Sequence, residues 1–129
     1  MKKVLVIDDM WNVADEIHYS FSTTKAEELE VLSSDAVASI EEAIRLIEKY
    51  KPDIIALDMS LTDGGEEGAE VALYLHNSSY AGLVVMISSR DKEDLVRLVG
   101  GFGITHYASK KPDKLYECIS GNCSCESKG

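Results

Sequence analysis

Two adjacent aspartates, Asp8 and Asp9, directly follow a short apolar run at residues 4–7. A third aspartate, Asp58, ends a second apolar run at residues 54–57. Neighbouring carboxylates repel each other, and at about 5 Å with an effective dielectric constant near 20 each pair costs roughly 3 kcal/mol. A bound cation relieves that repulsion, and carboxylate oxygens at the mouth of a crevice suit Mg2+ better than Zn2+. If the fold brings the three acids together, they predict a magnesium site.

Other polar side chains follow later apolar runs in the same way. Ser88 comes after residues 83–87, and Lys110 and Lys111 come after a weaker run at residues 104–109. A carboxylate beside a cation, a hydroxyl group and an ammonium group can take part in phosphoryl transfer. The carboxylate attacks phosphorus while the positive groups neutralise the phosphoryl oxygens. These residue types therefore indicate a site that accepts a phosphoryl group.

Short apolar runs that alternate with helical patterns must position these residues. The runs at 4–7, 54–57 and 83–87 are continuous, which is typical of strands covered on both faces. Weaker strands are expected at 30–37 and 104–109. The pattern predicts an α/β, flavodoxin-like fold, a doubly wound five-stranded parallel sheet of order 2-1-3-4-5 with helices on both faces. Its strand order reverses between the first and third strands, so the aspartates would share one crevice at their carboxyl ends.

Local signals mark the ends of five expected helices. Ser39 and Glu42 form a capping box for the second helix, and Asp91 is the expected cap of the fourth. The first and fifth helices are expected after Asn12 and from Pro112. Four residues of the third helix are expected to share one face: Ala69, Ala72, Leu73 and His76.

The composition limits the classes of function. A chain of 129 residues, 45% of them apolar and 28% charged, is typical of one soluble globular domain. Its 13 Lys and Arg residues against 23 Asp and Glu residues give a net charge of −10. That charge repels nucleic acid and anionic lipid, so no direct nucleic-acid binding is expected. The longest apolar run is far below the ~18 residues that span a bilayer, and no signal peptide is visible. We therefore expect no membrane insertion and a cytoplasmic location.

The carboxyl-terminal residues contribute little to the prediction. Cys118, Cys123 and Cys125 lack the paired spacing of a zinc site and the even count of a disulfide framework. Residues 122–129 form a polar tail that we expect to be disordered, after a single domain over residues 1–121.

Four stretches of the chain carry a family resemblance. They read VLVIDDM, IIALDMSLTDGG, VVMISSRD and GITHYASKKPDKL. In this order they resemble the motifs of response regulator receiver domains, the phosphoacceptor modules of two-component signalling, over about residues 2 to 121. The resemblance implies the flavodoxin-like sheet, a Mg2+ cofactor and phosphorylation of an aspartate.

The resemblance also implies a role for each matching residue. Asp58 takes the position of the phosphoacceptor. Asp9 is similar to the direct metal ligand and Asp8 to an acid that acts mostly through water, while Asp58 and the backbone carbonyl of Ser60 complete the metal site. Ser88 takes the position of a switch hydroxyl, where threonine is more common.

Two positions near the last motif leave alternatives. Tyr107 takes the position of an aromatic switch residue, but a buried tyrosine there needs no such role. Lys110 and Lys111 are adjacent, and a one-residue shift turns a strand side chain to the opposite face. Spacing from Tyr107 favours Lys110 as the lysine that binds the phosphoryl group. The acidic, glycine-rich loop at residues 62–68 departs from the family pattern and is expected to affect the choice of partner, not the chemistry.

The resemblance implies a signalling protein and not an enzyme. A histidine kinase or phosphotransfer protein would donate to Asp58, and the surface of helix 4, strand 5 and helix 5 would signal to a protein partner. The alternative is a phosphorylation-independent pseudo-receiver that acts as a protein-interaction module. A phosphatase of the haloacid dehalogenase type is disfavoured because it places a D-x-D motif after its first strand, where this chain has DDM. Whether the chain is a fragment of a longer regulator stays open, as do its oligomeric state and the phosphoryl lifetime.

Overall fold

The computed structural model describes residues 2–9, 29–32, 37, 39–61, 65–88, 91–104 and 106–108. The elements within these residues are β1 (Lys2–Ile7), β2 (Leu29–Val31), α2 (Ile40–Tyr50), β3 (Ile54–Asp58), α3 (Glu67–Asn77), β4 (Leu83–Ile87), α4 (Lys92–Val99), a 3-10 helix (Gly100–Phe102) and β5 (His106–Ala108). The helices expected after Asn12 and from Pro112, and the tail at 122–129, lie outside the described residues. None of the described helices has the length and apolar character needed to cross a membrane.

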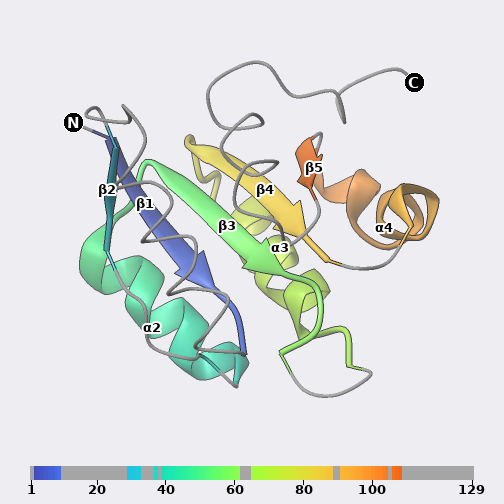
Figure 1. Cartoon of the computed structure of the whole chain (residues 1–129), viewed down its shortest axis with the longest axis horizontal. Coiled ribbons are helices and arrows are strands. Elements are labelled where there is room, and N and C mark those ends of the chain that lie inside the picture. Colours follow the sequence, from blue (N-terminus) through green and yellow to red (C-terminus); the bar gives the residue numbers. More distant parts are fainter. Residues whose placement is uncertain are drawn as a thin grey trace.

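The strands form one parallel sheet in the order β2-β1-β3-β4-β5 (Figure 1). Each neighbouring pair is parallel, and the register aligns Ile7 with Leu57 and Asp58 with Ile87. This is the strand order expected from the sequence. From β1 the chain adds β2 on one side of the sheet and then β3, β4 and β5 on the other side. The direction of strand addition therefore reverses between β1 and β3, which are neighbours in the sheet.

The core lies on both faces of the sheet. Residues of α2, α3 and α4 pack against the strand side chains of one face, including Leu5, Ile7, Ile55 and Leu57. Helix α3 contacts both α2 and α4, so the three helices form one layer (Figure 1). The strand side chains that alternate with these are also buried: Val4, Val6, Ile54, Ala56, Val85 and Ile87. Burial on both faces explains the uninterrupted apolar runs.

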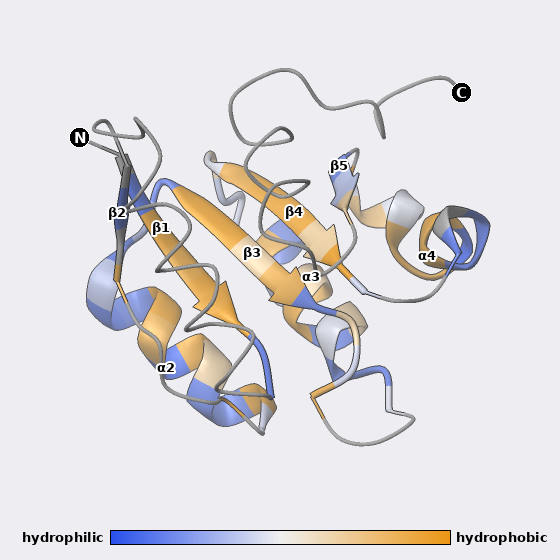
Figure 2. Cartoon of the chain, viewed as in Figure 1, coloured by the Kyte–Doolittle hydropathy of each residue, from blue (hydrophilic) through white to orange (hydrophobic). Residues whose placement is uncertain are grey.

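Figure 2 shows where the apolar runs of the sequence end in the fold. The central strands β1, β3 and β4 are hydrophobic along most of their length, and the chain becomes hydrophilic at the carboxyl ends of β1 and β3. The polar residues that interrupt the apolar pattern therefore gather at one edge of the sheet, the edge where the ligand crevice of such folds lies.

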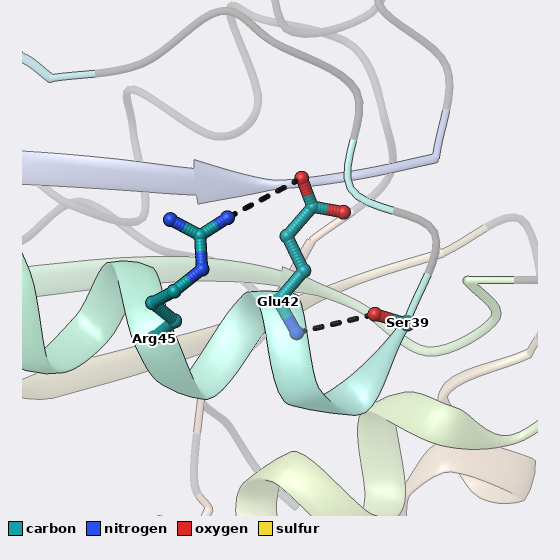
Figure 3. Close-up of polar contacts among 3 residues, drawn as sticks. All are labelled: Ser39, Glu42 and Arg45. Carbon is teal, nitrogen blue, oxygen red and sulfur yellow. Dashed lines mark hydrogen bonds and ion pairs between the residues drawn. The ribbon is translucent and has the colours of Figure 1, made fainter.

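Helix α2 begins at the cap that the sequence predicted. The Ser39 hydroxyl accepts a hydrogen bond from the Glu42 backbone N–H at 3.1 Å (Figure 3). Arg45 lies one turn further on, with its guanidinium 4.0 Å from the Glu42 carboxylate. Both side chains are exposed, so this pair adds little to stability compared with the cap. Burial of Ala43 and Ile47 fixes the helix against the sheet.

Three local expectations were wrong or incomplete. The second strand covers Leu29–Val31, whereas the prediction was 30–37. Asp91 precedes α4 without a side-chain capping hydrogen bond. Helix α3 exposes Leu73 and His76, two of the four residues that were expected to be buried. Its buried face lies about one residue earlier in the sequence and consists of Gly68, Val71, Ala72 and Leu75. A shift of one residue rotates the buried face by about 100°, and apolar residues occupy both stripes.

Candidate functional site

The predicted acidic residues meet at the carboxyl ends of β1 and β3. Because Ile7 pairs with Leu57, the next residues, Asp8 and Asp58, leave neighbouring strands at the same level. Ligand oxygens of Asp8, Asp9 and Asp58 all lie within 4.8 Å of one another. Asp8 and Asp58 are buried and Asp9 is half-buried. The convergence that the sequence required is therefore present.

Backbone hydrogen bonds hold the two strand ends in place. The Asp8 carbonyl accepts from the Val37 N–H at 2.8 Å, and the Met59 N–H donates to the Ile87 carbonyl at 3.3 Å. The Ser60 N–H donates to Asp58 Oδ1 at 3.2 Å. This last bond fixes the Asp58 carboxylate relative to the backbone of Ser60, the residue whose carbonyl was expected to bind metal.

After β3 the chain bends at Met59 and again at Leu61. Met59 and Leu61 are buried in the core cluster, while Ser60 is half-buried and bonded to Asp58 through the hydrogen bond just described. The segment is also bonded to the start of α3. The Ser60 hydroxyl donates to the Gly65 carbonyl, and the Leu61 N–H donates to Glu67 Oε1 at 3.0 Å.

Gly68 brings α3 close to the backbone of this segment. Its N–H donates to the Met59 carbonyl at 2.8 Å. A Cβ atom at this position would lie 2.2 Å from the Asp58 carbonyl oxygen and 2.7 Å from the Met59 Cα. Only glycine fits there without movement of the backbone. Three residues of the loop at 62–68, namely Gly65, Glu67 and Gly68, therefore contact residues 58–61 directly, although the loop was expected to matter only for the choice of partner.

The sequence reasoning missed the contacts of Gly68 and Glu67 for different reasons. A glycine inside a predicted helix was a usable signal, since it often marks a close backbone approach. The contact of Glu67 with Leu61 had no comparable signal, because it depends on how the intervening loop closes.

Of the remaining predicted site residues, the structure describes Ser88 and Tyr107 but neither lysine. Ser88 is buried at the end of β4, and its N–H donates to the Ala108 carbonyl at 3.2 Å. Tyr107 on β5 is buried in the core cluster, and its hydroxyl donates to the Ile104 carbonyl at 2.8 Å. Burial raises the pKa of this phenol above its ordinary value. Lys110 and Lys111 lie outside the described residues, and the choice between them stays a prediction.

The donor set determines which ligand the site can hold. Three carboxylates give up to three negative charges within a few ångströms, and two of them have little contact with solvent. Separations of this size cost several kcal/mol unless a cation or protons neutralise them. All-oxygen ligands favour a hard divalent cation such as Mg2+ over Zn2+.

Comparison with known proteins agrees with this geometry. The model of the response regulator receiver domain family matches residues 4–120. Sensory transduction protein LytT of Bacillus anthracis is 34% identical over 92 residues, which cover 71% of this chain and 35% of that protein. The chain thus spans about a third of the length of this curated relative.

Solved structures share the fold. A DNA-binding response regulator of the LuxR family from Staphylococcus aureus superposes with a TM-score of 0.79 at 17% identity, covering 95% of this chain and 98% of that chain. The Mn2+-bound form of response regulator Rcp1 superposes with a TM-score of 0.69 at 18% identity, covering 94% and 91% of the two chains. At such identities the likeness shows a common fold.

Proposed function

This chain belongs to the response regulator receiver domain family of two-component signalling, and from that premise we propose that it is a phosphoacceptor whose Asp58 receives a phosphoryl group. The donor is the phosphohistidine of a histidine kinase or phosphotransfer protein. The observation that supports this most strongly is the convergence of Asp8, Asp9 and Asp58 within 4.8 Å at the carboxyl ends of β1 and β3. Like charges this close together lower the stability of the fold unless a cation binds to them.

In the proposed reaction a carboxylate oxygen of Asp58 attacks phosphorus and forms an O–P bond. The P–N bond to the donor histidine breaks, and its electron pair goes to the imidazole nitrogen, which takes up a proton. The Ser60 N–H, already bonded to Asp58 Oδ1, keeps the carboxylate oriented for this attack. The site thus acts as a substrate of its kinase, and we propose no separate enzyme activity for the chain.

Mg2+ is the cofactor that we propose for this site. When bound, it supplies positive charge opposite the phosphoryl oxygens. Asp9 and Asp58 would hold it directly, Asp8 mostly through water, and the Ser60 carbonyl would add a further oxygen. The all-oxygen donor set supports this choice, as does the Mn2+-bound form of the structural relative Rcp1.

Ser88 and Lys110 would bind the phosphoryl oxygens once they are in place. We assign the hydroxyl of Ser88 and the ammonium group of Lys110 to this task because both follow strands that end at the same edge of the sheet. Movement of Ser88 toward the phosphoryl group would change the surface of α4, β5 and the helix expected after β5, with Tyr107 as the aromatic switch residue. A protein partner would read that surface, and we place the reaction in the cytoplasm.

The test is the intact mass of the protein after incubation with acetyl phosphate and Mg2+. We expect a gain of one phosphoryl group in the unmutated chain and none in Asp58→Asn. Asp91→Asn is the matched control, because Asp91 is exposed before α4 and its side chain makes no capping hydrogen bond. It should gain the phosphoryl group as the unmutated chain does.

Two results would overturn the proposal. Phosphorylation of Asp58→Asn to the same extent would place the acceptor elsewhere. No phosphorylation of the unmutated chain, by acetyl phosphate or by a phosphorylated histidine phosphotransfer domain, would favour a phosphorylation-independent pseudo-receiver.

A further inference from the structure

The peptide unit between Ser60 and Leu61 connects the metal site with α3. Its N–H belongs to Leu61 and donates to Glu67 Oε1 at 3.0 Å. Its carbonyl belongs to Ser60 and is the backbone oxygen that we assign to Mg2+. In a trans peptide the N–H and C=O groups point in opposite directions within one rigid plane. No cis peptide bond occurs among the described residues, so the direction of the Leu61 N–H determines the direction of the Ser60 carbonyl.

The other contacts given for Ser60 and Leu61 act on neighbouring atoms. Burial of the Leu61 side chain anchors its Cα in the core. The hydrogen bonds from Ser60 to Asp58 and Gly65 fix the preceding N–H and the side chain. Neither constrains the plane that follows the Ser60 Cα. Among the described residues, Glu67 bonds to this plane directly, and the bond is charge-assisted, which makes it about twice as strong as a neutral hydrogen bond.

We infer that Glu67 is a positioning residue that orients the Ser60 carbonyl toward the divalent cation through the Leu61 N–H. This inference rests on the proposed function, because it assumes that the Ser60 carbonyl is a metal ligand. Glu67 acts through another group and does not itself touch the cation. Groups that orient ligands in this way typically change metal affinity by 10-fold or more when they are removed.

A second effect of Glu67 must be separated from this one. Glu67 stands in the first turn of α3, where any carboxylate interacts favourably with the helix dipole, and its negative charge attracts cations generally. Glu70 shares both properties, since it also lies in the first turn of α3 and is exposed. If Glu67 acted only through its charge or through helix stability, replacing Glu70 would lower Mn2+ affinity as well.

The experiment compares Mn2+ affinity, measured by isothermal titration calorimetry, among the unmutated chain, Glu67→Ala, Glu67→Gln and Glu70→Ala. We expect about a 10-fold loss of affinity in Glu67→Ala. Glu67→Gln should lose less, because its amide oxygen can still accept from the Leu61 N–H. Glu70→Ala should bind as the unmutated chain does. Equal affinity in all four proteins would overturn the inference, as would equal losses in Glu67→Ala and Glu70→Ala.

A metal-free measurement keeps the inference testable if a variant fails to fold. Hydrogen exchange of the Leu61 amide in the unmutated apo protein should be slow, because the bond to Glu67 protects it. Exchange at the rate of an unstructured amide would contradict the inference whatever the variants do. If the unmutated chain binds no Mn2+ at all, the proposed function fails instead, and the Leu61 amide measurement still reports on the contact itself.

Discussion

Gly68→Ala tests how tightly α3 is packed against Asp58 and Met59 at the end of β3. The added Cβ would lie 2.2 Å from the Asp58 carbonyl oxygen, 2.7 Å from the Met59 Cα and 2.9 Å from the Met59 carbonyl oxygen. All three are backbone atoms, so no side-chain rotation relieves the clash, and either the helix or the segment must move. We therefore expect lower stability and slower phosphorylation of Asp58.

Two opposing effects set the size of the change. Overpacking costs roughly 1–3 kcal/mol, and loss of the Gly68 hydrogen bond to Met59 costs about 1 kcal/mol more. Alanine in a helix is favoured over glycine by at most about 1 kcal/mol. The clash prevails, and the net loss is about 2 kcal/mol, which for a chain of this length lowers Tm by roughly 8 °C.

The assay is urea denaturation followed by circular dichroism, together with the rate of phosphorylation by acetyl phosphate. Gly101→Ala is the matched control, since a Cβ there has no atom within 4 Å. It should leave both quantities nearly unchanged. A Gly68→Ala protein as stable as the unmutated chain would refute the reasoning, because it would mean that the close approach is absent in solution.

Two further predictions concern stability. Ser39→Ala should lower the free energy of unfolding by about 1 kcal/mol, because it removes the cap of α2. The control Ser78→Ala, at an exposed site, should lower it by less than half of that amount. Equal losses for the two variants in urea titrations would contradict the capping role. Burial, with a smaller effect from nearby Asp53, raises the pKa of Tyr80 to about 12, above its unfolded value of 10. The folded state keeps this proton longer than the unfolded state, so the resulting stability is full below pH 10 and is lost as the pH rises toward 12. At pH 11 the loss is about 1 kcal/mol, and the advantage of the unmutated chain over Tyr80→Phe should shrink by that amount between pH 9 and 11. A constant difference between the two proteins would show that the pKa of Tyr80 is ordinary.

The sequence predicted features that depend on local pattern. The buried runs of β1, β3 and β4 follow from their continuous apolar residues, and the α2 cap follows from Ser39 and Glu42. The convergence of Asp8 and Asp58 needed only one more step, the rule that parallel strands end at a common edge. These parts succeeded because each depends on residues that are close in sequence or on general topology.

Features that depend on tertiary contacts were less predictable. The buried face of α3 was placed one residue late, since the apolar side chains of Val71, Leu73 and Leu75 do not distinguish between two neighbouring stripes. The short β2 strand pairs with β1 over three residues, and the length of that pairing is not encoded in β-propensity. The bond between Glu67 and Leu61 spans a loop closure, so no periodicity reports it.

The central claim is that acids from β1 and β3 share one divalent cation. Its most direct test is calorimetric titration of Mn2+ into the unmutated chain, Asp9→Asn, Asp58→Asn and the control Asp91→Asn. We predict one site in the unmutated chain and in the control, with affinity reduced in both Asp9→Asn and Asp58→Asn. Unchanged affinity in either of those two variants would show that the strands do not share a cation, and would contradict the account.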